Sequence, residues 1–188
     1  MVTGPSGAGK GTLIRALVER RPDLEVAISA TTRPRRAGEV DGREYSFLSE
    51  EEFDRRVAKG GFLEHVVYVS GQRYGTLNSE VDRILGEGRS CILELETQGA
   101  RAVEEIRPET VSIFVGAPSF GELERRLRER ATESAGEIGE RLALARRQME
   151  EAGDFDYVVT NDDLERAVSE LERVVNREIG AAGTIPAR

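Results

Sequence analysis

The chain has 188 residues, of which 38% are hydrophobic and 33% are charged. This length supports one well-cored domain with room for inserted lobes, and the composition is that of a globular protein rather than a disordered one. The formal charge of −8 argues against general nucleic-acid binding, because the average field repels a phosphate backbone. A small phosphorylated substrate is not excluded, since a local cluster of arginines reverses the sign of the field within a cleft.

Several features of the sequence indicate the cellular compartment of the protein. No apolar run approaches the ~20 residues that a membrane helix needs, and the N-terminus has no basic segment leading into an apolar one. The single Cys91 cannot form an internal disulfide, which agrees with a reducing compartment. We therefore expect a cytoplasmic protein with no membrane contacts, in which Cys91 is a small buried core residue rather than a reactive thiol.

Apolar runs alternate with helical patterns along the chain. In chain order, the predicted elements are a helix at 13–18, strands at 24–28 and 62–69, a helix at 81–85, a strand at 91–95, a helix ending before Pro108, a strand at 111–115, a helix at 138–149, a strand at 157–159 and a helix at 164–175. Two capping boxes, Ser49 with Glu52 and Ser119 with Glu122, each predict a further helix start.

Buried strands separated by helices predict an α/β fold with a mainly parallel sheet flanked by helices. Two stretches interrupt the alternation, one rich in Arg, Gly and Tyr and the other highly charged. We expect a single domain over residues 1–188. Its predicted parts are a core at about 1–28, 82–122 and 154–188, an inserted lobe at 29–81 and a second excursion at 123–153.

The strongest local signal is a glycine-rich loop near the N-terminus. Its residues are Gly4, Pro5, Ser6, Gly7, Ala8, Gly9, Lys10, Gly11 and Thr12. Glycines at these positions let successive N–H groups point at phosphate oxygens, and the following helix adds its positive end. Lys10 would bring a full charge to the β- and γ-phosphates of a nucleotide. A plain glycine-rich turn before a helix is the alternative.

Two irregularities accompany this loop. The strict pattern has Ser or Thr directly after the lysine, whereas here Gly11 takes that place and the hydroxyl comes at Thr12. This form resembles small-molecule kinases such as adenylate kinase, in which Mg²⁺ rests mainly on phosphates and water. Only three residues precede Gly4, so the first strand is nearly absent. We interpret this as a start assigned too late, with a stunted middle strand as the alternative.

Residues 29–45 carry the pattern Ser-x-Thr-Thr-Arg…Arg-x-Gly-Glu…Tyr. Later motifs follow in order: Phe62-Leu63-Glu64, Tyr74-Gly75-Thr76, Gln98-Gly99 and Val159-Thr160-Asn161-Asp162-Asp163. From Gly4 to about Glu178, the chain resembles the guanylate kinase family of P-loop nucleoside monophosphate kinases. The resemblance implies a P-loop kinase core, a GMP-binding lobe at 29–81 and a mobile lid at 123–153. It also implies Mg²⁺-dependent phosphoryl transfer from ATP to GMP, and to dGMP, in purine nucleotide metabolism and GMP recycling.

The acceptor phosphate has four candidate ligands. Arg33 and Arg36 offer planar forks suited to a phosphate, and Tyr45 and Tyr74 offer hydroxyl donors. By resemblance, these four residues hold the phosphate of GMP, with Arg33 also taking part in catalysis. A solvated basic turn is the alternative for the two arginines.

Guanine offers N1–H and its 2-amino group as adjacent donors, and O6 as an acceptor. By resemblance, the Glu64 carboxylate accepts both donors, while Ser29 and Thr76 serve O6. Taken alone, Glu64 also fits a solvated carboxylate. Glu96 stands where the family usually has Asp, which reaches the guanine amino group and the water shell of the metal. Glu39 matches a family carboxylate near the phosphates.

The second excursion carries candidate lid arginines. By resemblance, Arg130 and Arg141 contact the transferring phosphates, with Arg126 as a third. Glu129 and Ala131 replace two usual glycines, which predicts a stiffer lid hinge. A salt-bridged exposed helix is the alternative.

Asn161 is expected to face the adenine of ATP, and a helix-capping Asn is the coexisting alternative. No side chain is predicted to ligate Mg²⁺ directly; Thr12, Glu39 and Glu96 are the candidates to reach it, chiefly through water. His65, the only histidine, is expected to be a structural strand residue.

Two rival functions share this scaffold. A ribosyl-bisphosphate kinase would lack the guanine-reading pair Glu64 and Thr76, which is present here. A non-catalytic guanylate-kinase-like binding module would lack the phosphate loop, but Lys10 and its glycines are intact. The sequence therefore favours an enzyme that uses ATP and GMP as small-molecule substrates, with no nucleic-acid or membrane partner.

Overall fold

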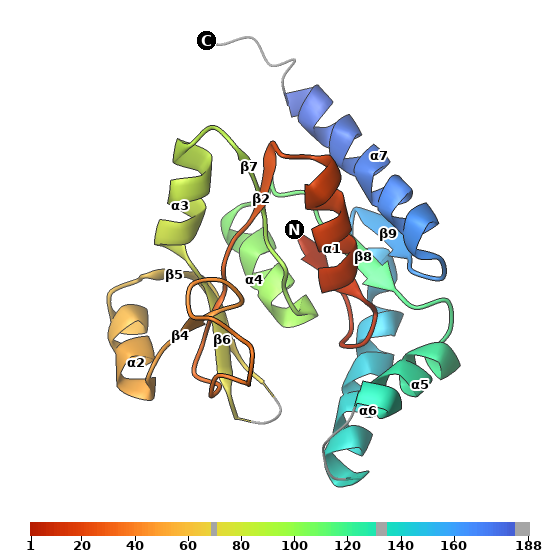
Figure 1. Cartoon of the computed structure of the whole chain (residues 1–188), viewed down its shortest axis with the longest axis horizontal. Coiled ribbons are helices and arrows are strands. Elements are labelled where there is room, and N and C mark those ends of the chain that lie inside the picture. Colours follow the sequence, from red (N-terminus) through yellow and green to blue (C-terminus); the bar gives the residue numbers. More distant parts are fainter. Residues whose placement is uncertain (69–70, 131–134, 183–188) are drawn as a thin grey trace. The chain divides into compact units, whose positions relative to one another are not determined.

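The computed structural model describes residues 1–68, 71–130 and 135–182. Its contacts divide the chain into two compact units. Figure 1 colours the chain from red at the N-terminus to blue at the C-terminus. The first unit joins Met1–Arg21 to Val111–Arg188, and the second unit is Pro22–Thr110. These bounds differ from those of the predicted core, lobe and lid, which remain a prediction.

The first unit contains a parallel sheet with the order β1-β8-β9. Its strands are β1 (Val2–Thr3), β8 (Ile113–Gly116) and β9 (Tyr157–Thr160). Strand β8 is buried over its whole length, as expected for the central strand of a parallel sheet. Although it has only two residues, β1 pairs in register with β8, Val2 opposite Ile113.

Two long helices of this unit lie side by side, α1 (Lys10–Arg20) and α7 (Leu164–Ala182) (Figure 1). Leu17 and Leu171 are fully buried, in agreement with the helical spacing of the apolar residues. Arg20 pairs with Glu165 at 2.5 Å across the two helices.

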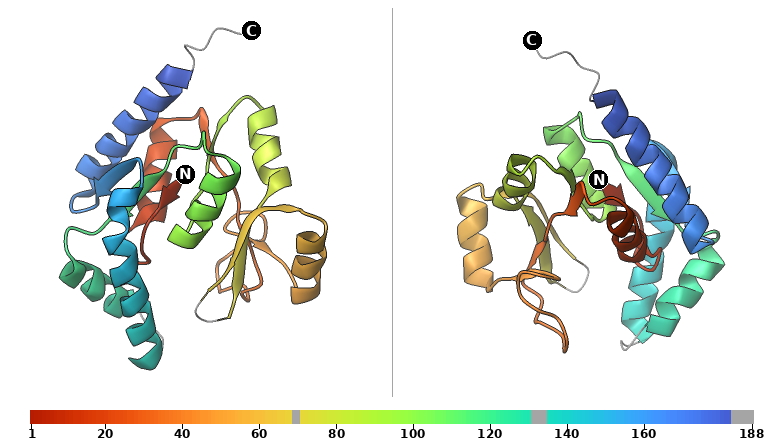
Figure 2. Two further views of the ribbon diagram at one scale, coloured as in Figure 1. Left: turned by 180° about the vertical axis from the view of Figure 1, so that it is seen from behind. Right: turned by 45° about the horizontal axis from the view of Figure 1, so that its top comes forward.

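A second pair consists of α5 (Phe120–Arg130) and α6 (Ala135–Glu150), which adjoin each other in both views of Figure 2. Leu123, Leu127 and Ala145 form a small apolar cluster with Ala117. Leu142 and Met149 pack against this cluster. The predicted amphipathic helix is thus confirmed. A 3₁₀ turn, η1 (Ala152–Asp154), leads from α6 to β9.

The second unit has two sheets. Strands β2 (Leu24–Val26) and β7 (Ser90–Ile92) pair in parallel. A four-stranded sheet has the order β4-β3-β6-β5. Its strands are β3 (Ala30–Thr31), β4 (Ser46–Phe47), β5 (Phe62–Val67) and β6 (Arg73–Leu77). Pairs β3–β6 and β5–β6 are antiparallel, whereas β3–β4 is parallel. The predicted interruption of the parallel pattern therefore corresponds to a mainly antiparallel sheet.

Three helices belong to the second unit, α2 (Glu50–Ala58), α3 (Asn78–Gly86) and α4 (Thr97–Ile106). Helix α2 docks through Phe53, whose ring stacks on Phe62 with the centroids 4.4 Å apart. The guanidinium carbon of Arg73 lies over the Phe53 ring, 4.3 Å from the ring centroid. Within the three described ranges of the chain, no helix is long and apolar enough to cross a membrane.

Three predicted strands run past the C-terminal ends of the observed ones, and the strand predicted at 111–115 begins before β8, which starts at Ile113. Strand β2 ends at Val26, β5 at Val67 and β7 at Ile92; residue 69, the predicted end of the second of these strands, lies outside the described part. Leu93 and Leu95 are buried although they follow β7, because an apolar run reports burial and not ladder pairing. His65 lies in β5, as predicted, and Cys91 is partly buried, with burial raising the pKa of its thiol to about 11.

The first capping box provides a test of local stability. The Ser49 hydroxyl accepts a hydrogen bond from the backbone N–H of Glu52 at 3.1 Å. Replacing an N-cap hydroxyl by alanine costs about 1 kcal/mol, so we expect Ser49→Ala to lower the free energy of unfolding by that amount in urea denaturation. Ser49→Asp keeps an acceptor and should remain within a few tenths of the parent value. Equal losses in both variants would show that the cap is not the cause.

Candidate active site

The glycine-rich loop has the backbone that a phosphate-binding loop requires. Gly9 has φ 91° and immediately precedes α1. A Cβ atom at Gly9 would lie 2.3 Å from Nδ2 of Asn161, and one at Gly4 (φ 135°) would lie 2.1 Å from the carbonyl oxygen of Val115. Both positions therefore need glycine for its conformation and for space. The loop leads into the positive end of an 11-residue helix.

Lys10 is buried and folds back over its own loop. Its Nζ donates to the carbonyl oxygens of Gly4 at 2.6 Å and Pro5 at 3.2 Å. A phosphate bound in the loop would replace these carbonyls as the partner of the ammonium group. Thr12 lies in the first turn of α1, where its hydroxyl accepts a hydrogen bond from Arg15 at 3.4 Å.

Asn161 holds the backbone of the glycine-rich loop through a side-chain hydrogen bond. Its Nδ2 donates to the carbonyl oxygen of Ala8 at 2.7 Å. The alternative in which Asn161 caps the following helix is wrong: Asp163 does this, because its Oδ1 accepts from the backbone N–H of Arg166 at 2.9 Å. Sequence could not separate these residues, since three consecutive Asx side chains all fit a cap.

Two predicted lid arginines contact the glycine-rich loop or Asn161. Arg141 donates to the Ser6 hydroxyl at 2.9 Å. Arg126 donates to the carbonyl oxygen of Asn161 at 3.1 Å and to Glu122 at 2.7 Å. Arg130 and Ala131 lie outside the part of the chain whose side chains the structure describes.

The second unit holds a buried ion pair at the predicted phosphate-binding segment. Arg33, with 6% of its side chain exposed, pairs with Glu39 through two parallel bonds of 2.7 and 3.0 Å. The backbone N–H of Arg36 also donates to Glu39, at 2.7 Å. These bonds lower the pKa of Glu39 and raise that of Arg33. Glu39 is thus mainly a partner of Arg33, which no sequence pattern had indicated.

Two tyrosines adjoin this pair. The Tyr45 and Tyr74 rings meet edge to face with their centroids 5.9 Å apart. The guanidinium carbon of Arg33 lies 5.3 Å from the Tyr45 ring centroid. Burial, followed by the negative charge of Glu94, raises the pKa of Tyr45. The structure brings Arg33, Tyr45 and Tyr74 together, whereas the Arg36 side chain is exposed.

Glu64 is the buried carboxylate of the second unit, with 6% of the residue exposed. It lies opposite Thr76 in the β5–β6 register, and the Thr76 hydroxyl donates to Oε1 of Glu64 at 2.9 Å. Burial raises the pKa of Glu64, and the bonds from Thr76 only partly offset this effect. Thr76 therefore serves Glu64, although its hydroxyl had been expected to serve a guanine O6.

The remaining predicted residues are only partly buried. Ser29 directly precedes β3, and its carbonyl oxygen accepts from the backbone N–H of Ser46 at 2.9 Å. Glu96 is the residue before α4, and its side chain does not cap that helix. Glu94, which sequence reasoning passed over, raises the pKa of Tyr45 more than Glu39 does.

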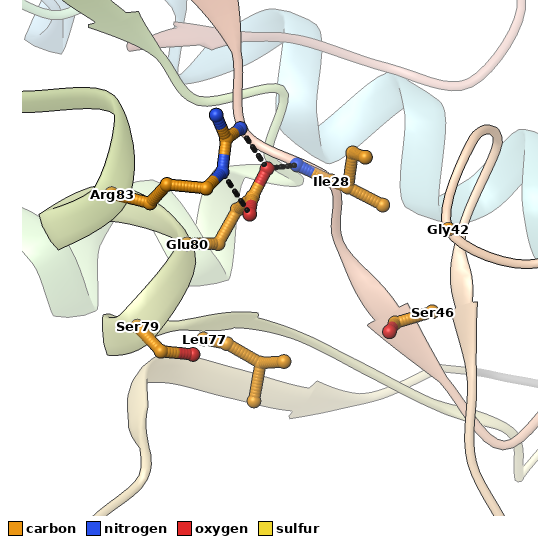
Figure 3. A pocket seen from close by; sticks show the side chains of 7 residues that line it. All are labelled: Ile28, Gly42, Ser46, Leu77, Ser79, Glu80 and Arg83. Carbon is orange, nitrogen blue, oxygen red and sulfur yellow. Dashed lines mark hydrogen bonds and ion pairs between the residues drawn. The ribbon is translucent and has the colours of Figure 1, made fainter. Parts of the chain in front are cut away.

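The same unit also has a hollow of about 460 Å³ (Figure 3). It is lined by Ile28, Gly42, Ser46, Leu77, Ser79, Glu80 and Arg83. Arg83 is bound to Glu80, whose carboxylate also accepts from the backbone N–H of Ile28. The lining contains none of the predicted site residues, and its two charges neutralise each other.

The raised pKa of Glu64 gives a stability prediction. The native state binds this proton more tightly than the unfolded chain, whose carboxyl has the ordinary pKa of 4.5. Native stability is therefore lost as pH rises from about the unfolded pKa through the native one. Glutamine has the same length and no charge. We expect Glu64→Gln to unfold at higher urea concentration than the parent at pH 8, and the difference to vanish below pH 4.5.

The control for this measurement is Glu105→Gln, at an exposed position of α4, which should leave the urea midpoint nearly unchanged at both pH values. A Glu64→Gln protein that is less stable than the parent at pH 8 would contradict the assignment of a costly buried carboxylate.

Comparison with known proteins places this geometry in a family. The family model described as Guanylate kinase matches residues 1–178. The guanylate kinase of Rubrobacter xylanophilus is 51% identical over 177 residues, covering 94% of this chain and 92% of that protein. That of Symbiobacterium thermophilum is 47% identical over 178 residues, covering 95% and 84%.

Among solved structures, the guanylate kinase from Anaplasma phagocytophilum matches with a TM-score of 0.77 and 30% identity, covering 94% of this chain and 83% of that one. TT1252 from Thermus thermophilus, at 18% identity and a TM-score of 0.52, shares the fold. The glycine-rich loop and the Arg33–Glu64 region both fall within the matched residues 1–178, and this chain belongs to the guanylate kinase family.

Proposed function

We propose that this chain transfers the γ-phosphoryl group of ATP to GMP, and to dGMP, giving ADP and the nucleoside diphosphate. Membership of the family supports this reaction. The observation that carries the specificity is the buried Glu64 carboxylate, which has a hydroxyl but no cation as its partner in the described structure. The phosphate loop in the other unit supplies the donor site.

On the donor side, the loop from Gly4 to Thr12 cradles the ATP phosphates. Lys10 moves from the carbonyls of Gly4 and Pro5 to the phosphate oxygens. This exchange needs little new desolvation, because the ammonium is already buried. Asn161 holds the loop through Ala8 and lies on the adenine side.

On the acceptor side, Arg33, Arg36, Tyr45 and Tyr74 bind the phosphate of GMP. Glu39 fixes the fork of Arg33 through two bonds and thereby limits the rotamers of a long side chain. A guanidinium held in place loses less entropy on binding than a freely moving one. Of the four residues, Arg36 is the exposed one, so its side chain has the most conformational freedom to lose when the phosphate binds.

The base is read by Glu64, with Ser29, Thr76 and Glu96 at its margins. A carboxylate accepts the N1–H and 2-amino donors of guanine together, whereas adenine presents no such pair on its Watson–Crick edge. A buried carboxylate left without these donors is costly. Glu64 therefore discriminates against AMP through the cost of the mismatch.

The chemistry needs no covalent intermediate and no general base, because the acceptor phosphate is already anionic at neutral pH. Catalysis is alignment together with charge neutralisation by Lys10, Arg33, Arg130 and Arg141. Arg141 is already held near the loop by Ser6. Other ion pairs of the lid helices, such as Arg125 with Glu122, fit the salt-bridged-helix alternative for that stretch.

Mg²⁺ supplies neutralisation of the phosphate charge when it is bound with ATP. The hydroxyl of Thr12, in the first turn of α1, fits a group that reaches such an ion. Glu39 does not fit a direct ligand, because its carboxylate already accepts three bonds from Arg33 and Arg36. Glu96, partly buried before α4, fits a contact through water.

A coupled ADP-release assay with a panel of acceptors tests the proposed reaction. We expect turnover with GMP and dGMP, and none above background with AMP or ribose 1,5-bisphosphate. Product identity is checked by anion-exchange separation of GDP. Turnover of ribose 1,5-bisphosphate instead of GMP would favour the sugar-phosphate kinase, and absence of ATP binding would favour the non-catalytic module.

Glu64→Ala tests the base-reading role. We expect the ratio of kcat/KM for GMP over AMP to fall by at least about 100-fold, because a charge-assisted contact made to both guanine donors is lost. The KM for ATP should stay near the parent value. Glu105→Ala is the control, and an unchanged GMP-over-AMP ratio in Glu64→Ala would refute the assignment.

A further inference from the structure

A glycine without any backbone requirement lies against the Glu64 carboxylate. Gly99 is the third residue of α4, is buried, and has no positive φ. Alanine stabilises a helix interior more than glycine does. Alanine at this position would therefore make the helix itself more stable, so the reason for glycine must lie in the residues packed around it.

The group packed most closely against Gly99 is the Glu64 carboxylate. A Cβ atom at Gly99 would lie 2.8 Å from Oε2 and 3.4 Å from Cδ of Glu64, while the next neighbour, Cβ of Leu95, is at an ordinary 3.8 Å. Both residues belong to the second unit. The missing side chain of Gly99 is thus the space that one oxygen of Glu64 occupies.

The other oxygen of Glu64 is also fixed. Oε1 accepts the hydroxyl proton of Thr76 at 2.9 Å. The carboxylate is therefore tied to β6 on one side and stopped by the first turn of α4 on the other. That turn is the positive end of the helix dipole, which favours a carboxylate next to it.

From this contact we infer that Gly99 is a specificity-determining position of the GMP site, which acts by setting where the Glu64 carboxylate lies. The inference rests on the proposed function, in which Glu64 reads guanine. A methyl group at residue 99 would displace Oε2, and with it the direction in which both oxygens face the base. Because the displaced atoms are the end of a flexible side chain, the protein would remain folded while its selectivity changes.

The test is Gly99→Ala, with Gly86→Ala as the matched control. Gly86 ends helix α3 in the same unit, and a Cβ atom there would have nothing within 4 Å. We expect Gly99→Ala to reduce kcat/KM for GMP by at least about tenfold, mainly through KM, since a base contact present before the chemical step is weakened. The KM for ATP should not change. Gly86→Ala should match the parent in every constant.

A double-variant cycle separates this role from a general effect on the helix. In a Glu64→Ala background there is no carboxylate to displace, so adding Gly99→Ala should leave the remaining GMP and AMP rates unchanged. If Gly99→Ala alone fails to fold, the double variant should fold, because the crowded oxygen has been removed. Urea denaturation of all four proteins gives this readout.

The outcomes are distinct. If the parent enzyme turns over GMP and the Gly99→Ala variant keeps the parent GMP-over-AMP ratio, this inference is overturned while the proposed function stands. Equal losses from Gly99→Ala with and without Glu64, or unfolding of both proteins that carry Gly99→Ala, also overturn it. A parent chain that does not phosphorylate GMP removes the proposed function, and the inference falls with it.

Discussion

The second unit is organised around one unfavourable fact, an anion held out of water without a cation. Glu64 has 6% of its surface exposed and is bonded to the Thr76 hydroxyl. A carboxylate in such a place is costly until donors satisfy both of its oxygens. A ligand that brings two adjacent N–H groups relieves the cost, and one that brings none leaves it in full. Under the proposed function, selectivity for the base would follow from the cost of keeping this carboxylate buried.

The two buried cations of the proposed site, Lys10 and Arg33, have more hydrogen-bond partners than the buried anion does. Lys10 is bonded to the carbonyls of Gly4 and Pro5, and Arg33 to the carboxylate of Glu39. Arg33 is buried with a charged partner and Lys10 with two carbonyl oxygens, so both cations are already hydrogen-bonded before a phosphate binds. In the proposed function, phosphate binding would replace or add to these existing bonds and would not desolvate a free cation. In the proposed function, the hydrogen-bonded cations would provide phosphate affinity and the Glu64 carboxylate would provide the choice of base.

Local sequence rules predicted what depends on neighbours in the chain. The capping hydroxyls of Ser49 and Ser119 bind where the boxes indicated, and the glycine-rich loop leads into a helix at Lys10. Strand ends were predicted less well, because Leu93 is buried by tertiary packing and not by a ladder. The bond from Asn161 to Ala8 spans 153 residues of sequence, and no local pattern encodes it. Family resemblance is the source of the proposed site residues, while their contacts required the fold.

The motif glycines illustrate the difference between a conformational and a spatial requirement. At Gly9, the backbone has φ 91° and the absent Cβ gives room to the Asn161 amide, so a side chain would both strain the chain and break the hydrogen bond from Asn161. At Gly99, the backbone is an ordinary helical one and only the Glu64 carboxylate is in the way. A glycine in a sequence pattern does not reveal which case applies. The two cases differ in consequence. A side chain at Gly9 would disturb both the loop and the fold, whereas a methyl group at Gly99 would move only the Glu64 carboxylate, which we propose reads the base, without a change of backbone.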